Sequence, residues 1–267
     1  MHRLLVFDVD KTLLNSNKEI PVDALDDIHE LKKNGYLVTI ASGRAASDLQ
    51  DIIDTVHCDI PFICSSGACI VDQKKREILM QFPILQEIKD QVVHIANTHV
   101  NMGIVCHFSD GCVCDEQGFK TWQDWYGDLN DMEVALSLEQ TIPAPLKIDI
   151  LGEKESLMKM ENDLVAKRVS VEISSSSDHT LEITARGVSK GSGLMHLSAF
   201  QNIPLEQIIV FGDSANDLSM FTVAGYSVCL GSTNELLMSK ATLIAPDSDQ
   251  NGLSWALREL FKYVLHE

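Results

Sequence analysis

Short apolar runs alternate with amphipathic segments toward both ends of the chain. A continuously apolar run of strand length is typical of a strand buried on both faces, as in a parallel sheet. The segments between the runs carry apolar residues at helical spacing, for example Leu25, Ile28 and Leu31. This alternation predicts a doubly wound α/β fold with right-handed crossovers. The expected strands lie at residues 4–7, 36–41, 62–64, 207–211, 226–230 and 242–245.

The pattern changes after Pro83. Residues 84–185 predict a helix and a hairpin, followed by a strand, a second helix and a second hairpin. The serine run 174–177 is expected to form only a loop. This order indicates a compact α+β insert with one open-faced sheet. We therefore expect a core domain made of residues 1–83 and 186–267, with the insert between its two parts.

Two carboxylates follow the first apolar run. Asp8 and Asp10 are two residues apart, so an extended chain places both on the same side, and Thr12 follows. Ligands of open α/β sheets bind just beyond the carboxyl ends of such strands. Carboxylates held this close repel unless a proton or a cation lies between them, and Mg²⁺ prefers oxygen ligands. The pattern predicts a metal and ligand site, although Asp and Thr also form ordinary turns.

Two further stretches place polar groups where an anion could bind. Ser42 and Gly43 follow the second apolar run, where a glycine lets a ligand approach the backbone before a helix N-terminus. Lys190 lies in a glycine-containing loop that opens a helix, where a cation can meet a phosphate or neutralise carboxylates. Ser42 could equally be a helix N-cap, and Lys190 a solvated loop lysine.

The most apolar strand, residues 207–211, ends in a second acidic group. Asp213 and Asp217 are four residues apart across a strand-to-helix turn, so both can face one cation. Gly212 and Asn216 are residue types that suit a tight ligand loop. Asp217 could instead be an acid in the first turn of a helix, where the helix dipole stabilises it.

The charge balance restricts the partners of this chain. With 39 acidic and 21 basic residues the net charge is −18, which argues against nucleic acid or an anionic membrane as the main partner. A small anionic substrate remains compatible, because a metal and local cations can reverse the field in one cleft. No apolar run approaches the roughly 20 residues of a membrane span. The seven cysteines lack a zinc-type spacing, and no signal peptide is expected, which favours reduced thiols in a cytoplasmic protein.

Together these four stretches resemble the motifs of the haloacid dehalogenase (HAD) superfamily. The overall pattern is most similar to its Cof-like sugar-phosphate phosphatases, which carry a large α/β cap between the second and third motifs. Each motif alone is weak, but all four occur in order over nearly the whole chain. The matching stretches are Asp8-Val9-Asp10-x-Thr12, Ser42-Gly43-Arg44, Lys190-Gly191 and Gly212-Asp213-x-x-Asn216-Asp217.

The resemblance implies a phosphatase that hydrolyses small phosphate monoesters, such as sugar phosphates, through an aspartyl-phosphate intermediate. Asp8 would be the nucleophile, and Asp10 would protonate the leaving alcohol and then activate the hydrolytic water. Lys190 would bridge the phosphate and Asp8. The remaining implied roles are phosphate binding by Thr12, Ser42, Gly43 and Asn216, and Mg²⁺ binding by Asp8, the Asp10 backbone carbonyl, Asp213 and Asp217, the last directly or through another ligand.

Some residues depart from the family pattern and leave alternatives open. Lys11 stands where glycine is usual, so we expect an unfavourable backbone conformation or a shifted loop there; Ser66 and Ser232 also replace commoner residues. A fixed cation beside the metal site could hold a phosphate and slow its transfer, which would suit a non-catalytic sensor of phosphorylated metabolites. A phosphomutase is a third alternative. The substrate itself is not identified, although the insert would supply its contacts.

Overall fold

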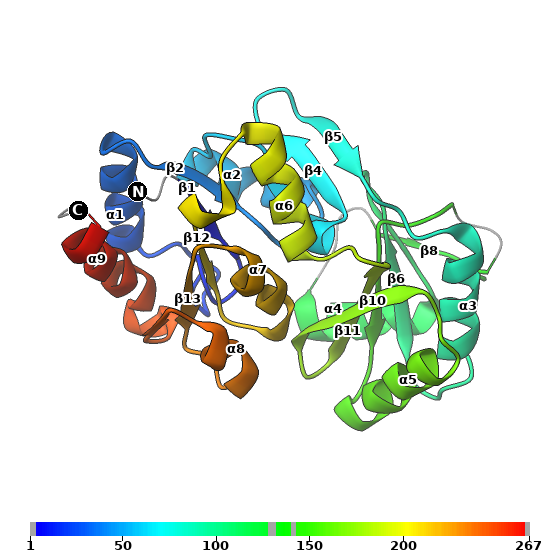
Figure 1. The fold of residues 1–267 in the computed structure, drawn as a ribbon. Coiled ribbons are helices and arrows are strands. Elements are labelled where there is room, and N and C mark those ends of the chain that lie inside the picture. The colour runs from blue at the N-terminus through cyan, green and yellow to red at the C-terminus, as the bar shows by residue number, and fades with distance from the viewer. Residues whose placement is uncertain (1–3, 128–131, 140–142, 265–267) are drawn as a thin grey trace.

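The core of the fold is a five-stranded parallel sheet, at the left of Figure 1. The computed structural model describes residues 4–127, 132–139 and 143–264. The strand order is β14–β13–β12–β1–β2, and all neighbours in it pair in parallel. The predicted parallel α/β fold is therefore confirmed. The strands are β1 (Leu4–Phe7), β2 (Leu37–Ile40), β12 (Ile208–Gly212), β13 (Tyr226–Leu230) and β14 (Leu243–Ala245).

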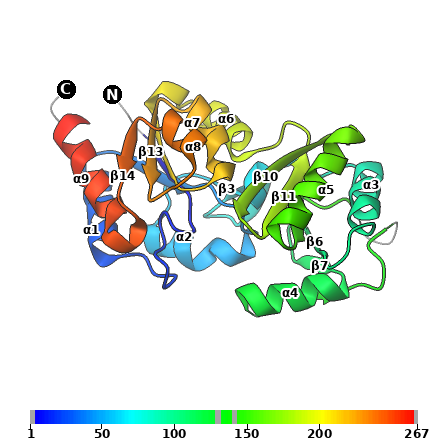
Figure 2. The ribbon, with the colours of Figure 1, turned by 90° about the horizontal axis from the view of Figure 1, so that it is seen from below.

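Helices cover both faces of this sheet (Figures 1 and 2). Leu5 and Phe7 of β1 join one buried hydrophobic cluster with α1, α2 and α9, whereas Leu4 and Val6 join a second cluster with α6, α7 and α8. Alternate residues of a strand point to opposite faces, so an all-apolar strand requires both layers. The helices are α1 (Val22–Lys33), α2 (Gln50–Val56), α6 (Lys190–Gln201), α7 (Leu218–Val223), α8 (Glu235–Lys240) and α9 (Gly252–Val264).

The third expected strand of the parallel sheet lies mainly in another sheet. β3 (Phe62–Cys64) pairs antiparallel with β4 (Cys69–Asp72), which pairs with β5 (Glu77–Gln81). Only a single parallel bridge, Ala41 to Ile63, joins β3 to the end of β2. The chain reverses immediately after β3 through residues 65–67, all of which have positive φ. This tight reversal makes β4 the nearest pairing partner.

A six-stranded sheet forms the second layered unit, at the right of Figure 1. Its order is β10–β11–β9–β6–β7–β8, antiparallel except for the β7–β8 pair. The predicted α+β insert is present, while its boundaries at residues 84 and 185 stay a prediction. The strands are β6 (Gly103–His107), β7 (Cys112–Cys114), β8 (Met132–Val134), β9 (Lys147–Leu151), β10 (Val171–Ser177) and β11 (Thr180–Ala185).

Two details of the insert differ from the expectation. β8 was not predicted, because a three-residue strand carries little periodic signal. The serine run 174–177 continues strand β10 and is not a loop, since it pairs with β11 around a short turn. Backbone pairing with the neighbouring strand outweighs the weak strand preference of serine.

Helices of the insert cover its sheet unequally. Apolar residues of α3 (Gln86–Ala96) and α5 (Lys154–Ala166) pack on one face with Ile104, Ile148 and Ile150. On the other face α4 (Glu116–Tyr126) packs around a smaller cluster of Val105, Cys112, Cys114 and Leu151. Part of that second face is therefore left for contacts with the core. Within the described ranges, no helix combines the length and the apolar character needed to cross a membrane. All seven cysteines are buried and free.

A buried charge cluster lies on this second face. His107 Nε2 and Lys147 Nζ both approach Asp149 Oδ2, at 2.7 and 2.9 Å. Burial by itself would lower the pKa of His107 and raise that of Asp149. The ion pairs dominate, because Asp149 raises the pKa of His107 to about 9, and Lys147 and His107 lower the pKa of Asp149 to about 2. The insert thus holds charged groups in its interior.

We expect the stability that His107 contributes to disappear in alkaline solution. Its folded pKa of about 9 exceeds the ordinary value of 6.5, so folding takes up a proton between these pH values. The wild type should exceed His107→Gln in unfolding free energy by the largest amount below pH 6.5, and this difference should shrink as the pH rises through about 9. Urea denaturation across this range measures it, with the exposed His94→Gln as control. A difference that does not change with pH would contradict this assignment.

Candidate active site

Asp8 and Asp213 leave neighbouring strands at the same edge of the core sheet. β1 and β12 pair in parallel with Phe7 opposite Phe211, and the two rings stack with centroids 4.5 Å apart. Asp8 follows Phe7 directly, and its N–H donates to the Phe211 carbonyl at 2.9 Å. The carboxyl ends of parallel strands meet at one edge, so the polar residues that follow these strands converge.

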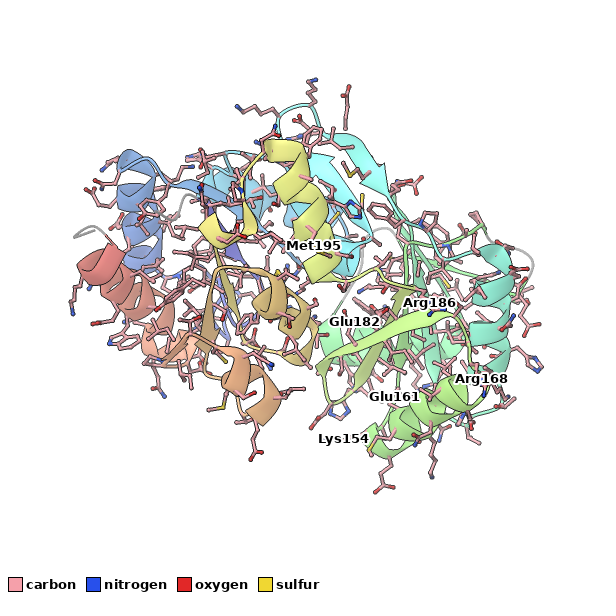
Figure 3. The ribbon with its side chains drawn as sticks, viewed as in Figure 1. Lys154, Glu161, Arg168, Glu182, Arg186 and Met195 are labelled. Atoms are coloured by element: carbon pink, nitrogen blue, oxygen red, sulfur yellow. The ribbon has the colours of Figure 1, made fainter. Side chains whose placement is uncertain are left out.

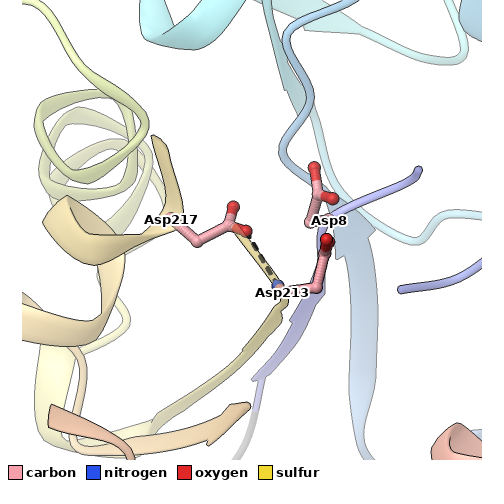
Figure 4. A group of neighbouring side chains, drawn as sticks. All are labelled: Asp8, Asp213 and Asp217. Atoms are coloured by element: carbon pink, nitrogen blue, oxygen red, sulfur yellow. Dashed lines mark hydrogen bonds between the residues drawn. The ribbon is translucent and has the colours of Figure 1, made fainter. Parts of the chain in front are cut away.

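Three carboxylates meet at this edge. One oxygen each from Asp8, Asp213 and Asp217 lies within 4.8 Å of the others (Figure 4). Asp217 is fully buried, and its Oδ2 accepts hydrogen bonds from the N–H groups of Asp213 and Ser214, at 3.0 and 3.1 Å. These bonds fix the turn between β12 and the following helix. A set of converging carboxylate oxygens is a donor set that suits a hard divalent cation.

Lys190 reaches the same carboxylates from the start of α6. Its Nζ donates to Asp8 Oδ1 at 2.5 Å, to Asp217 Oδ1 at 2.7 Å and to Asn216 Oδ1 at 3.2 Å. The preceding Ser189 is a helix N-cap that accepts from the Ser192 N–H, which fixes where the helix begins. The lysine side chain is fully enclosed and satisfies all three ammonium protons.

The carboxylates of Asp8, Asp213 and Asp217, called the acidic group from here on, carry more negative charge than a buried site favours. Burial raises the pKa of Asp8 well above its ordinary value, and the neighbouring Asp217 adds to the effect. Burial and Asp217 also raise the pKa of Asp213 to about 7. Burial alone would lower the pKa of Lys190, but Asp217 and Asp8 raise it overall. A further cation would relieve the repulsion between the carboxylates, so the residues present fit a divalent metal ion.

The hydroxyl groups expected near phosphate border this site. Thr12 is fully buried, and its Oγ1 donates to Asp213 Oδ1 at 3.0 Å. The Ser42 Oγ accepts from the Arg44 N–H at 3.1 Å, at the end of β2 beside β1. A Cβ built on Gly43 would lie 3.2 Å from the Ser66 Oγ. A larger residue at this position would therefore press against its neighbour.

Asp10 lies apart from the three clustered carboxylates. Arg44 holds it through two hydrogen bonds, Nε to Oδ2 at 2.9 Å and Nη2 to Oδ1 at 2.5 Å. The sequence placed Arg44 in the second motif but suggested no partner for it. Its contact with Asp10 could not be anticipated, because the two residues belong to different loops that only the pairing of β1 with β2 brings together.

Glu182 of strand β11 also borders the site and was not predicted. Its Oε2 accepts from the Ser66 Oγ at 2.6 Å, and its Oε1 lies 3.5 Å from the Asn216 Nδ2. It is 3% exposed. The sequence shows an acidic residue among the apolar residues of this strand, which is unusual for a buried position. The neighbouring residues give no sign that this acid contacts the core.

Lys11 adopts the unfavourable conformation expected for it. Its φ is +59°, in the left-handed region that glycine adopts without strain. Its ammonium lowers the pKa of Asp213 electrostatically, opposing the effect of burial. The loop therefore keeps the turn that glycine would make, and it adds a positive charge next to the acidic group.

A cavity of about 490 Å³ adjoins the acidic group. It lies between the tip of the β10–β11 hairpin, residues 175–178, and core loops that include Lys11, Asp213 and residues 231–234. Ser232, one of the departures from the family pattern, therefore lines the same cavity as Lys11. The cavity is bordered by both layered units.

A family model for haloacid dehalogenase-like hydrolases matches residues 5–257. The chain belongs to this family. The predicted membership is confirmed, and the match includes the core strands, the insert and all four motifs.

Known relatives of this hydrolase agree with the assignment. The Bacillus subtilis protein 5-amino-6-(5-phospho-D-ribitylamino)uracil phosphatase YwtE is 25% identical, with 97% of this chain and 98% of the relative covered. Pyridoxal phosphate phosphatase YbhA of Escherichia coli is 22% identical, covering 94% of this chain and 96% of the relative. The crystal structure of a haloacid dehalogenase-like hydrolase from Bacteroides thetaiotaomicron superposes with a TM-score of 0.82 at 22% identity, covering 98% of this chain and 100% of that chain.

Removing the Lys190 charge should destabilise the protein strongly. Lys190→Met keeps the length of the side chain but leaves Asp8 and Asp217 buried without their shared cation. Breaking a buried ion pair in this way costs about 3–5 kcal/mol of unfolding free energy. Chemical denaturation measures it against Lys240→Met, an exposed lysine in the last turn of α8. A loss similar to that of the control would mean that Lys190 does not hold the acidic group together.

Proposed function

We propose that this HAD-family hydrolase is a Mg²⁺-dependent phosphatase of small phosphorylated metabolites that works through an aspartyl-phosphate. The chain is a phosphoric monoester hydrolase of its family, as predicted; the metal and the intermediate are the proposed part. The observation that carries the proposal is the contact between the Lys190 ammonium and Asp8 Oδ1 at 2.5 Å, at the edge where Asp213 also lies. Relatives named as phosphatases of a ribitylaminouracil phosphate and of pyridoxal phosphate support the substrate class.

The first step transfers the phosphoryl group to Asp8. Its carboxylate attacks phosphorus while the bond to the ester oxygen breaks, and a proton from Asp10 goes to the leaving alcohol. Lys190 holds the Asp8 carboxylate in one orientation and offers positive charge to the phosphoryl oxygens. Both carboxylate oxygens of Asp10 accept hydrogen bonds from Arg44. Asp10 must therefore lose one of these two bonds when the substrate binds before it can deliver a proton.

The second step returns Asp8 to its starting state. Asp10 takes a proton from water, the water oxygen bonds to phosphorus, and the bond between phosphorus and Asp8 breaks. We assign Thr12, Ser42 and Asn216 to the phosphoryl oxygens. The Ser42 hydroxyl can donate to them, and the Thr12 hydroxyl can do so once it releases Asp213 Oδ1. These donors would stabilise the charge that collects on the phosphoryl oxygens.

The metal ligands we propose are the carboxylates of Asp8 and Asp213 together with the backbone carbonyl of Asp10. Mg²⁺ bound there would neutralise the nucleophile and the phosphoryl oxygens as they approach each other. Asp217 already uses Oδ1 for Lys190 and Oδ2 for two backbone N–H groups. We therefore assign Asp217 the role of holding Lys190 and the Asp213 loop in place.

The non-catalytic sensor stays the alternative because of Lys11. Its ammonium lies in the field of Asp213, where it could oppose metal binding. A sensor would be stabilised against heat by a phosphate ester without hydrolysing it. No specific contact in the structure favours a phosphomutase.

Asp8→Asn should abolish phosphate release. The amide is isosteric with the carboxylate but is a poor nucleophile, so the rate with an aryl phosphate should fall by at least about 1,000-fold. Phosphate release with Mg²⁺ and with EDTA measures this, and Asp23→Asn, in the exposed first turn of α1, should behave as the wild type. Equal rates for wild type and Asp8→Asn would show that another group is the nucleophile.

Lys11→Gly should tighten Mg²⁺ binding about threefold to fivefold. The substitution removes a solvent-exposed positive charge, which repels Mg²⁺, from beside the metal ligands. Calorimetric titration with MgCl₂ alone measures the affinity without any turnover. Lys18→Gly is the matched control, since Lys18 has a φ of +62° in the same loop region but is not among the main groups that shift the pKa of Asp213. If both variants changed Mg²⁺ affinity equally, backbone strain and not charge would be responsible.

A further inference from the structure

Glu182 is one of the residues through which the sheet of the insert reaches the catalytic edge of the core. Figure 3 shows it on β11, at the side of the insert nearest the core. Its two carboxylate oxygens face Ser66 and Asn216, at 2.6 and 3.5 Å. Asn216 in turn accepts from Lys190, and a Cβ on Gly43 would lie 3.4 Å from Glu182 Oε1. The carboxylate therefore lies immediately beside the residues assigned to the phosphoryl group.

Glu182 belongs to a row of polar residues on one face of that sheet. It pairs directly with Asp149 on β9, and Lys147 lies two residues before Asp149 and pairs with His107 on β6. Residues that pair directly or are two apart along a strand share a face of the sheet. All four side chains are almost completely buried. The sheet face opposite α3 and α5 thus carries charged residues from Glu182, which contacts the core, to His107 in the interior of the insert.

One acceptor on this face has no partner. Asp149 Oδ2 receives both Lys147 and His107, whereas Asp149 Oδ1 is buried and has no hydrogen-bond partner in the described structure. A buried acceptor without a partner costs about 1–3 kcal/mol. A buried group without a partner is rare in native structures and therefore needs an explanation, such as a functional role.

The pairing of Glu182 with Asp149 is itself unfavourable for folding. Like charges directly opposite each other on neighbouring strands are destabilising, and burial increases the repulsion. Lys147 offsets part of it, since Asp149 and Glu182 together raise its pKa although burial alone would lower it. An apolar pair would serve the stability of the sheet better, so these acids have a use other than folding.

We propose that Glu182 and Asp149 form the subsite for the leaving group, and that they accept hydrogen bonds from hydroxyl or amino groups of a leaving group without an acid group of its own. The inference rests on the proposed phosphatase function. Carboxylates only accept, so they select donors, and they repel a second carboxylate or phosphate. In the structure the Ser66 hydroxyl supplies the donor that a hydroxyl of the substrate would supply.

Room for a leaving group lies at the tip of the hairpin that carries Glu182. The cavity of about 490 Å³ is lined there by residues 175–178, although neither Glu182 nor Asp149 is among its lining residues. A chain-like leaving group held at Glu182 would extend along the hairpin toward this cavity.

The test compares esters that differ only in donors and charge. Wild type, Glu182→Gln and Glu182→Ala are assayed with a hexitol 6-phosphate, hexyl phosphate, an aldonic acid 6-phosphate and an aryl phosphate. The wild type should prefer the hexitol ester over the other two six-carbon esters. Glu182→Ala should lower kcat/KM for the hexitol ester by about 10- to 100-fold and change the aryl and hexyl esters less than about threefold. Glu172→Gln, an exposed acid on the other strand of the hairpin, is the matched control.

Two results would overturn the proposal. One is an equal loss with all esters, which would mean that Glu182 acts on the phosphoryl site through Asn216. The other is a wild type that does not distinguish the hexitol ester from hexyl phosphate. Glu182→Gln keeps the volume of the side chain and remains testable if the alanine variant does not fold.

A binding measurement separates this proposal from the proposed function. In an Asp8→Asn background, Glu182→Ala should weaken binding of the hexitol ester by a similar factor and leave binding of inorganic phosphate unchanged. If no ester is hydrolysed by the wild type, the phosphatase assignment fails, and this titration still decides the subsite. Unchanged affinity for the hexitol ester would refute the subsite in either case.

Discussion

The buried contact of Lys190 with Asp8 and Asp217 is the constraint on which the catalytic edge depends. Three carboxylates that converge at the end of a parallel sheet repel one another unless a proton or a cation lies among them, and Lys190 supplies a cation. Lys190 comes from the first position of α6, directly after the chain returns from the insert. The point at which the chain leaves the insert therefore sets where α6 begins, and the start of α6 sets where the positive charge of Lys190 lies in the site.

The parallel sheet explains why distant residues form one site. β1 has β12 on one side and β2 on the other, so the loops after these three strands meet at one edge. Asp8, Asp213 and Ser42 follow these three strands, and Lys190 enters from the start of α6. Any exchange of strand order would separate these groups, whereas changes within the outer loops would not. This tolerance allows Lys11 to replace a glycine at the cost of a strained φ.

The insert carries a second, separate group of charges. His107 and Lys147 form ion pairs with Asp149 away from the catalytic edge, while Glu182 reaches across to Ser66 and Asn216. Apolar residues on the opposite face of the same sheet supply the packing energy through α3 and α5. One face thus stabilises the insert, which leaves the other face free to carry polar residues that folding alone does not require.

The α/β core, the α+β insert and the strand ends at which Asp8, Ser42 and Asp213 lie follow from the order of apolar runs and helical segments, because buried strands and amphipathic helices are local patterns. Three contacts follow only from the folded chain: Thr12 donates to Asp213, Arg44 holds Asp10, and Glu182 joins the site. The folded chain also has β3 in another sheet, because the chain reverses tightly at residues 65–67. These contacts join residues far apart in the chain, and their partners depend on strand order and burial, which no local pattern contains.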